Sequence, residues 1–484
     1  MTARKARLSS SGRALAESFA ALRAELQIPA EYPADAVAEA ERVIMSGIAV
    51  DGSDDARADL EYIPFLTIDP EGSRDLDQAM HLERDGDGYV VHYAIADLAA
   101  FVVPGGALDA ATRERGQTLY APDGSTGLHP EQIAGDAASL LPERRRRAYV
   151  WRFALGSDGR VADTRLVRAW VRSRRRWTYA EVQAELDAGT APDGLRLLAE
   201  IGALRIELEA ERGGASLRMP EEEIVEVRGQ FELRARATLP AEDFNAQISL
   251  MTGMAAAELM LRAKVGILRT MPPADQEAVD EFRRRVALLD RPWRTDISYG
   301  DYLRQQDPAD HATPAVMQAA TALFRGAGYE AFDGAPPKQA VQSAIAAPYS
   351  HATAPLRRLV DRYVLAICEA EANGSDIPGW AREALPQLPK IMGRSGQLAS
   401  RLENGCLARV EAAVLSHRIG REYVAVAVSR RGGNGTRVQI ATPFVTADVA
   451  GEPELGSIVR VRVDAADIAA GTISLSLVGA SPRE

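Results

Sequence analysis

Three aspartates lie within nine residues of one another in the first part of the chain: Asp69, Asp75 and Asp77. Carboxylates this close together repel one another, and burying them costs free energy unless a cation neutralises them. Hard oxygen ligands in a short loop suit Mg²⁺, and also Mn²⁺, far better than zinc. Because magnesium keeps several waters and completes its shell with substrate phosphates, the loop predicts phosphoryl chemistry that depends on a divalent metal.

Two plainer interpretations of this loop compete with the metal site. Its alternating oxygen-bearing side chains resemble a calcium loop, but an EF-hand needs glycine at its sixth position and glutamate at its twelfth. Counted from Asp69, Gly72 is fourth and Met80 is twelfth, so the calcium interpretation fails. A solvated acidic turn is the other alternative, and a second motif is needed to decide against it.

That second motif lies about 280 residues downstream, at 349–363, and reads Tyr-Ser-His-Ala-Thr-Ala-Pro-Leu-Arg-Arg-Leu-Val-Asp-Arg-Tyr. The first motif, at 67–79, reads Thr-Ile-Asp-Pro-Glu-Gly-Ser-Arg-Asp-Leu-Asp-Gln-Ala. In this order and separation, the pair resembles the two signatures of the ribonuclease II (RNB) family of 3′→5′ exoribonucleases. Shorter stretches that also resemble this family lie at 115–120, 128–130, 136–140 and 241–245, and the resemblance covers roughly residues 60–480.

The resemblance implies catalytic roles for residues of both motifs. Asp69, Asp75 and Asp77 would be the carboxylates that build the metal site, and Asp77 occupies the position on which catalysis depends most. Arg357 would clamp the scissile phosphate and offset its developing charge, which a planar guanidinium does well. Arg358 would contact the RNA backbone nearby.

The same resemblance implies three further contacts with RNA. Tyr120 would stack on the last nucleotide and set the minimum product length, while Tyr179 and Glu242 would contact riboses and so separate RNA from DNA. Ordinary core packing is the alternative for both tyrosines. The family also places a stacking phenylalanine near residue 217, where this chain has Leu217, so that half of the base clamp is altered.

Position 78 departs from the first signature, which carries a fourth aspartate where this chain has Gln78. An amide oxygen can still ligate a metal, so Gln78 stays among the expected ligands, but one negative charge is lost and a second metal would bind more weakly. Three hypotheses follow. The chain is an active exoribonuclease, which we favour, or an RNA-binding relative with weak or no catalysis, or a DNA-binding regulator that uses N-terminal helices.

Patterns along the chain predict a multidomain α+β protein. Residues 1–58 hold two short amphipathic helices, which permit either a small helical domain of helix-turn-helix type or a plain packing unit. Residues 59–418 mix strands with long helices, as expected of an RNB catalytic domain. Residues 420–484 alternate at period two between glycine-rich turns and resemble an S1-type OB-fold β-barrel, which can bind single-stranded RNA.

Within the central part, hydrophobic periodicity predicts individual strands and helices. Strands are expected near 89–96, 148–154 and 164–172, and helices near 179–186, 196–211, 241–264, 274–289, 314–327 and 357–372. No glycine-rich phosphate loop stands between a strand and a helix, and no cysteine–histidine set has zinc spacing. Nucleotide-triphosphate, dinucleotide and zinc binding therefore have no support in the sequence.

The formal net charge of −11 argues at first sight against a nucleic-acid partner. A binding channel depends on local charge, however, and arginines run at 144–147 and interleave with aromatic residues between Arg168 and Tyr179. Guanidinium groups suit phosphates and aromatic rings suit bases. A general preference for arginine over lysine is the alternative explanation of these runs.

Two cysteines imply no disulfide framework, and no apolar run is long enough to span a bilayer. We therefore expect a cytoplasmic protein without membrane attachment. The family resemblance implies a monomer that degrades single-stranded RNA processively to nucleoside 5′-monophosphates and leaves a short oligonucleotide.

Overall fold

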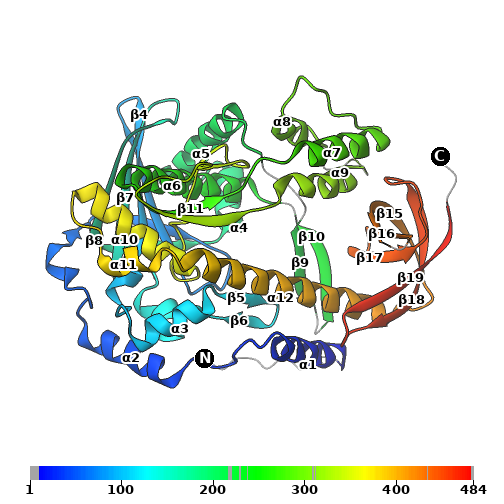
Figure 1. Cartoon of the computed structure of the whole chain (residues 1–484), viewed down its shortest axis with the longest axis horizontal. Coiled ribbons are helices and arrows are strands. Elements are labelled where there is room, and N and C mark those ends of the chain that lie inside the picture. Colours follow the sequence, from blue (N-terminus) through cyan, green and yellow to red (C-terminus); the bar gives the residue numbers. More distant parts are fainter. Residues whose placement is uncertain are drawn as a thin grey trace.

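The computed structural model describes residues 10–215, 221–227, 230–236, 238–307, 310, 312–432 and 434–480. These residues form N-terminal helices, a central body that mixes strands with helices, and a C-terminal five-stranded barrel (Figure 1). The predicted α+β class is confirmed. The segment around Leu217, where the family resemblance places a stacking phenylalanine, lies outside the described residues.

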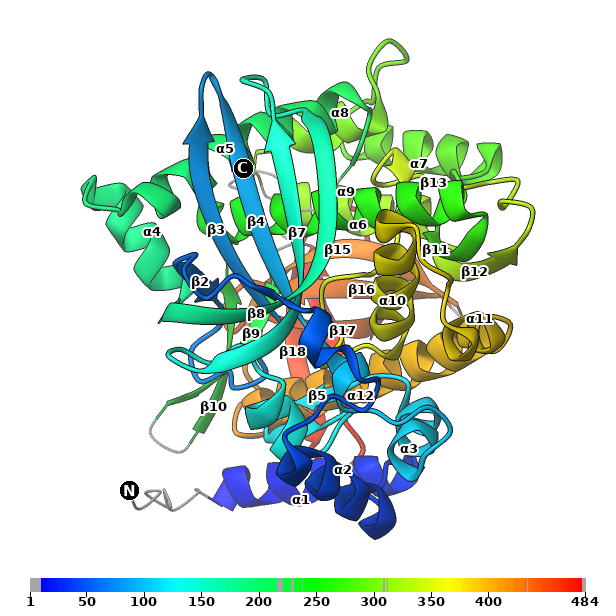
Figure 2. The ribbon, with the colours of Figure 1, turned by 90° about the vertical axis from the view of Figure 1, so that its left-hand side faces the viewer.

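The central sheet closes on itself through one long strand. Its strands are β1 (Ala58–Asp59), β2 (Phe65–Ile68), β3 (Gln78–Asp85), β4 (Gly88–Ala96), β7 (Arg145–Leu155) and β8 (Val161–Trp177). The strand order is β1-β8-β2-β3-β4-β7, and β8 also pairs with β7. Figure 2 shows β3, β4 and β7 side by side. Because the last residues of β8 lie parallel to β2, the acidic loop after β2 starts at the end of β8.

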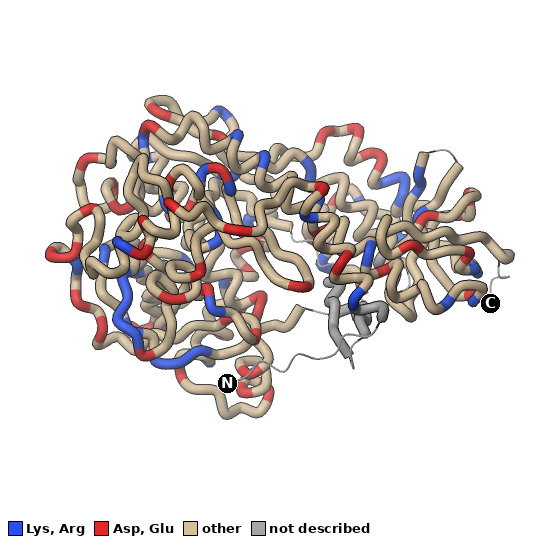
Figure 3. The backbone as a smooth tube through the Cα atoms, turned by 90° about the horizontal axis from the view of Figure 1, so that it is seen from below, with Lys and Arg blue, Asp and Glu red and all other residues tan. Residues whose placement is uncertain are grey.

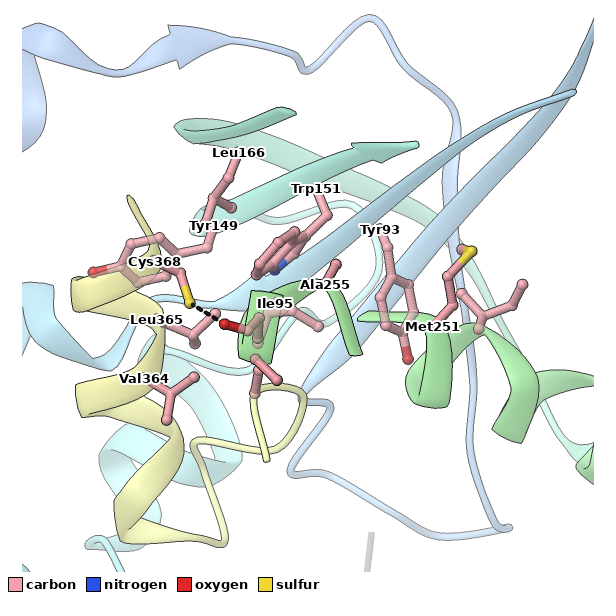
Figure 4. Close-up of a cluster of buried hydrophobic side chains, with 14 of the residues drawn as sticks. Tyr93, Ile95, Tyr149, Trp151, Leu166, Met251, Ala255, Val364, Leu365 and Cys368 are labelled. Atoms are coloured by element: carbon pink, nitrogen blue, oxygen red, sulfur yellow. Dashed lines mark hydrogen bonds between the residues drawn. The ribbon is translucent and has the colours of Figure 1, made fainter. Parts of the chain in front are cut away.

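Helices α4 (Tyr179–Ala188), α5 (Asp193–Glu211), α6 (Pro240–Ala263) and α10 (Leu359–Asn373) contribute to the largest core, against the sheet. Tyr93, Tyr149 and Trp151 are almost completely buried there. Figure 4 shows these strand side chains facing helices that carry Met251, Ala255 and Leu365. This packing fixes the start of α10, where the second motif ends.

The remaining described elements surround this core or lead to the barrel. They are α3 (Ala107–Arg115), β5 (Leu119–Ala121), β6 (Gly124–Thr126), β9 (Glu221–Val227), β10 (Gln230–Arg236), β11 (Val265–Thr270), α7 (Gln276–Leu288), α8 (Tyr299–Arg304), α9 (Thr313–Ala320), β12 (Gly328–Asp333), β13 (Val341–Gln342), β14 (Ala347–Pro348), α11 (Gly379–Ala384) and α12 (Leu388–Ser416), with short helical turns between some of them. Within the described ranges, no helix is both long and apolar enough to cross a bilayer.

Helix α12, with 29 residues, was not expected from the sequence. It runs from the central body to the barrel (Figure 1) and contacts β5 as well as β18. Near its C-terminal end, Glu411 accepts a hydrogen bond of 2.7 Å from the backbone N–H of Thr446 in the barrel. One continuous helix therefore joins the two parts.

The two N-terminal helices, α1 (Ser10–Glu25) and α2 (Ala34–Ser46), pack in different places. Leu15 and Phe19 of α1 belong to a cluster with α12 and the barrel. Ala36 and Ala40 of α2 belong to a cluster with the central sheet. Each helix therefore buries its apolar face against another part of the chain, and the helix-turn-helix alternative stays a prediction.

The C-terminal barrel consists of β15 (Glu422–Arg431), β16 (Gly435–Ile440), β17 (Val445–Ala450), β18 (Ile458–Asp467) and β19 (Thr472–Ala480). It is closed in the order β15-β16-β17-β19-β18. Val459, Val461 and Val463 are buried, so the period-two pattern of the sequence does mark the inner face.

Candidate active site

The acidic loop between β2 and β3 is held at both ends by backbone contacts. At its start, the N–H of Asp69 donates to the carbonyl oxygen of Trp177, at 3.1 Å. Near its end, the hydroxyl of Ser139 accepts from the N–H of Leu76 at 3.0 Å and donates to the carbonyl of Arg74 at 2.6 Å. These hydrogen bonds from β8 and from Ser139 fix the conformation of the acidic loop.

Asp77 is the point where the two motifs meet. Its side chain is only 6% exposed, and its Oδ1 accepts a hydrogen bond of 2.7 Å from the backbone N–H of Leu356. Its Oδ2 lies 3.6 Å from Nε of Arg357. A carboxylate that accepts from a backbone N–H and faces a guanidinium is fixed in orientation as well as in position.

Asp77 is a buried acid and Asp69 a partly buried one, and both have too little positive charge around them. Burial raises the pKa of Asp69 to about 7, and the charge of Asp75 adds to this rise, against the opposing effects of Arg176 and Arg357. Burial also raises the pKa of the Asp77 carboxyl well above its usual range, although Arg357 opposes it. Such acids are expected where a cation supplies the missing charge.

Among the residues that the structure describes, no three histidine, cysteine, aspartate or glutamate side chains already stand in ligating positions around one point. The chemistry of the donors nevertheless fits a hard divalent cation, because the carboxylates available are oxygen ligands, one of them buried and two partly buried. Asp69, Asp75 and Asp77 are the residues that would hold it.

The two consecutive arginines of the second motif have different surroundings. The side chain of Arg357 is 44% exposed and lines a cavity of about 740 Å³ beside Tyr120, Gln117 and the α12 residue Glu403. The side chain of Arg358 is 16% exposed and forms a two-pronged ion pair with the buried Asp361, at 2.9 and 3.0 Å. Both arginines line the cavity, but Arg357 is the more exposed and is available to a phosphate, whereas the guanidinium of Arg358 is already held by Asp361.

Gln78 uses both ends of its amide within the protein. Its Nε2 donates to the carbonyl oxygen of Thr353 at 2.6 Å, and its Oε1 accepts from the hydroxyl of Tyr93 at 2.6 Å. That hydroxyl also lies 2.9 Å from the hydroxyl of Ser249. The expectation that Gln78 ligates a metal stays a prediction, and the geometry gives this side chain a second role as a bridge between the motifs.

A Gln78→Glu substitution separates these two roles. If the amide acts as a bridge, the carboxylate loses the donor to Thr353 and faces its carbonyl oxygen, so the free energy of unfolding falls by about 1–3 kcal/mol. We expect this loss in chemical denaturation, together with slower RNA hydrolysis at every metal concentration. An unchanged stability with a lower metal requirement would instead identify position 78 as a ligand.

The predicted RNA-binding residues lie around the same loop. The hydroxyl of Tyr120, on β5, donates to Oδ2 of Asp75 at 3.2 Å, and its ring is half exposed. Burial raises the pKa of Tyr179 to about 12, with the charges of Asp69 and Glu242 adding to the rise. Tyr179 therefore lies close enough to both carboxylates for their charges to act on its hydroxyl.

At the site, Asn245 had no predicted role, and Arg176 was predicted only as one of the arginines between Arg168 and Tyr179 that suit RNA phosphates. The Nδ2 of Asn245, on α6, donates to the hydroxyl of Tyr179 at 2.9 Å and orients the ring. Nη1 of Arg176 donates to the carbonyl oxygen of Ser73 at 2.6 Å, inside the acidic loop. Arg176 stands out in the sequence only as one arginine of a run, because nothing local shows that the end of β8 lies beside this loop.

Comparison with known proteins adds two family matches. Residues 57–372 match the family model described as RNB domain, and residues 421–478 match the RNase II-type exonuclease C-terminal S1 domain. Ribonuclease R of Escherichia coli (strain K12) is 27% identical over 320 residues, which cover 63% of this chain and 39% of that protein. The alignments with the curated relatives Exoribonuclease 2 of Erwinia tasmaniensis and RRP44 homolog A of Arabidopsis thaliana cover only 21% and 40% of their lengths.

Solved structures share the fold at low sequence identity. Mycoplasma genitalium RNase R in complex with ribose-methylated single-stranded RNA matches with a TM-score of 0.84 and 17% identity, over 96% of this chain and 78% of that one. Yeast Ssd1, described as a pseudonuclease, matches with a TM-score of 0.70 and 17% identity, over 85% of this chain and 53% of that one.

Proposed function

We propose, from the premise that this chain belongs to the RNB family, that it is a 3′→5′ exoribonuclease acting on single-stranded RNA. The observation that supports this most is the contact of Asp77 with Leu356 and Arg357, which joins the acidic loop to the arginine of the second motif. A buried acid group, an exposed guanidinium and an adjoining cavity are the parts that phosphodiester hydrolysis needs.

A divalent cation bound by Asp69, Asp75 and Asp77 would supply Lewis-acid polarisation of the phosphate and a more acidic water. The protein's own part is electrostatic and geometric. Arg357 reaches into the cavity and binds the non-bridging oxygens, and it offsets the charge that develops there. Asp77 helps to orient this guanidinium, because its Oδ2 lies 3.6 Å from Nε of Arg357.

The end of the RNA would lie against Tyr120, whose half-exposed ring offers a stacking surface next to Asp75. Tyr179 and Glu242 would meet the 2′-hydroxyls of the terminal nucleotides. We further propose that hydrolysis is processive, releases nucleoside 5′-monophosphates and leaves a short oligonucleotide. A cytoplasmic monomer that prefers Mg²⁺, with Mn²⁺ as a substitute, completes the proposal.

Gln78 supports a second candidate function, an RNA-binding relative with weak or no catalysis. The site has one negative charge fewer than the family's signature provides, and the amide at this position is occupied by Tyr93 and Thr353. Yeast Ssd1 shares the fold and is described as a pseudonuclease, so the fold alone does not guarantee hydrolysis.

A time course with 5′-labelled single-stranded RNA separates these functions. We expect stepwise shortening from the 3′ end in Mg²⁺ and in Mn²⁺, with release of 5′-monophosphates, and no shortening in EDTA, because the acidic loop needs a cation to offset its charge. RNA that is bound but stays intact in every metal would contradict the nuclease and favour the RNA-binding relative.

A further inference from the structure

A group of cationic side chains at one end of β7 and β8 is not explained by the site. Register pairs Arg145 of β7 directly with Arg172 of β8, and Glu61 contacts both guanidinium groups at 2.6 and 2.7 Å. The carbonyl oxygen of Glu61 also accepts from Arg174, at 2.6 Å. We call this surface the arginine stripe, and its members are Tyr62, Arg144, Arg145, Arg172, Arg174 and Arg175.

The arginine stripe carries more positive charge than its contacts neutralise. Glu61 is shared between two arginines, and Glu143 lies 3.9 Å from Arg174. Within the described part of the chain, no carboxylate lies within ion-pair distance of Arg144 or Arg175, and both are exposed. Figure 3 shows long blue stretches of backbone on the side away from the C-terminus, in a chain whose formal net charge is −11.

Two arginines directly opposite each other in a sheet are destabilising, because like charges face each other across the strands. Elsewhere on the same sheet some arginines are compensated by buried carboxylates. Arg168, for example, binds the buried Asp97 as well as Asp51. Arg152 and Arg165 also face each other across β7 and β8, and Arg165 binds Asp163. The stripe differs in gathering five arginines near two carboxylates, Glu61 and Glu143, and an excess of this kind is expected where an external anion completes the charge balance.

The chain neighbour of the glutamate that binds these arginines is an exposed aromatic residue. Tyr62 follows Glu61, the residue that contacts three of the arginines, and 76% of its surface is accessible. A large ring left in solvent gives no folding advantage. Aromatic stacking of bases combined with arginine–phosphate contacts is the way proteins bind single-stranded nucleic acid without regard to sequence.

The stripe is continuous with the site. Arg176, next to Arg175 on β8, donates to the Ser73 carbonyl in the acidic loop and lowers the pKa of Asp69. At about 3.3 Å per strand residue, the four steps from Arg176 to Arg172 extend roughly 13 Å outward from that loop. A single-stranded RNA whose 3′ end lies at the aspartates can therefore reach the arginine stripe.

We propose that the arginine stripe binds single-stranded RNA outside the catalytic cavity, through backbone phosphates on the arginines and one base on Tyr62. This rests on the proposed function only in that the ligand is RNA. The stripe holds a part of the strand away from the reacting end, so it contributes to the binding of long RNA and not to the chemical step.

The test compares two exposed sets of residues with equal charge change. One variant is Tyr62→Ser/Arg144→Ser/Arg175→Ser. Its matched control, Arg160→Ser/Arg165→Ser, also removes two positive charges, from exposed positions at the opposite end of β8. Thermal melts of both proteins check that the fold is kept, and Tyr62→Ser alone provides a milder second variant.

Binding is measured by fluorescence anisotropy in EDTA, with a short oligonucleotide that fills only the cavity and with a strand several times longer. We expect the stripe variant to bind the long strand about tenfold more weakly, the scale of losing one stacked base. The slope of log affinity against log salt should fall by about 1.4, or about 0.7 for each phosphate that the variant leaves without an arginine. Binding of the short oligonucleotide and of the control variant should not change.

Unchanged binding of the long strand would overturn the proposal, as would an equal loss for both RNA lengths or an equal loss in the control. These outcomes are distinct from failure of the proposed function, which is judged by whether the unmodified protein shortens RNA in Mg²⁺. A protein that shortens RNA while the stripe variant binds normally would refute the stripe alone.

Discussion

Replacing Asp77 by asparagine is expected to slow RNA hydrolysis by roughly 10³-fold or more, the upper scale for removing one group that stabilises a transition state. The amide can still accept from the N–H of Leu356, so the loop keeps its shape. It brings no negative charge to a cation, however, and it no longer pairs with Arg357. The measurement is the initial rate of monophosphate release at saturating RNA in Mg²⁺, and RNA binding should persist.

Stability should change in the opposite direction in the same variant. Because the folded protein raises the pKa of Asp77 above its value in the unfolded chain, ionisation at neutral pH disfavours the folded state. That contribution is absent below the unfolded pKa and grows as pH rises toward the folded one. Asp77→Asn should therefore unfold at a higher temperature than the unmodified protein in EDTA at pH 8, and the difference should shrink as the pH is lowered.

Asp136→Asn is the matched control, since it makes the same chemical change at an exposed carboxyl in the neighbouring turn. It should leave both rate and stability nearly unchanged. An Asp77→Asn protein that keeps more than about a tenth of the rate would contradict the assignment, because no group that stabilises a transition state is so dispensable.

Arg358→Met is expected to lower the free energy of unfolding by about 3–5 kcal/mol, the cost of leaving a buried charge without its partner. Asp361 is fully buried and would keep only the N–H of Ala354 as a donor. Chemical denaturation measures this change. Adding Asp361→Asn should restore much of the loss, because the uncompensated charge is removed with its partner.

The adjacent Arg357→Met substitution serves as the comparison. Its guanidinium is partly exposed and 3.6 Å from Asp77, so stability should fall less than in Arg358→Met, while the rate should fall on the order of 10²–10³-fold. If Arg358→Met instead keeps its stability and loses affinity for RNA, Arg358 is the backbone contact that the family resemblance implies.

Much of the fold could be predicted from local periodicity. Strands β4, β7 and β8 and helices α4, α5, α6 and α10 lie where alternating or helical patterns of apolar residues place them. Helix α12 was not predicted, because Pro389 stands in its first turn and Gly393, Gly396 and Gly405 interrupt its apolar pattern. The helix forms nonetheless, because tertiary packing against α1 and the barrel outweighs weak propensity.

Less of the candidate site could be predicted from local sequence patterns. Sequence motifs name the aspartates and Arg357, and the spacing of Arg358 and Asp361 at three residues on a helix start is readable as an ion pair. Nothing in either motif shows that Leu356 donates to Asp77, or that Gln78 bridges to Thr353. Those contacts depend on where β3 and the start of α10 meet, which is a property of the whole core.

Helix α12 also carries a consequence for how this architecture can vary. Its residues Ala399, Glu403 and Cys406 line the cavity, and Glu411, little more than one turn later, holds the barrel through Thr446. Inserting one residue between Cys406 and Glu411 would rotate everything beyond it by about 100° and advance it by about 1.5 Å. The orientation of the barrel relative to the cavity therefore depends on the number of residues between Cys406 and Glu411. Insertions or deletions in this interval keep that orientation only when they add or remove close to whole helical turns.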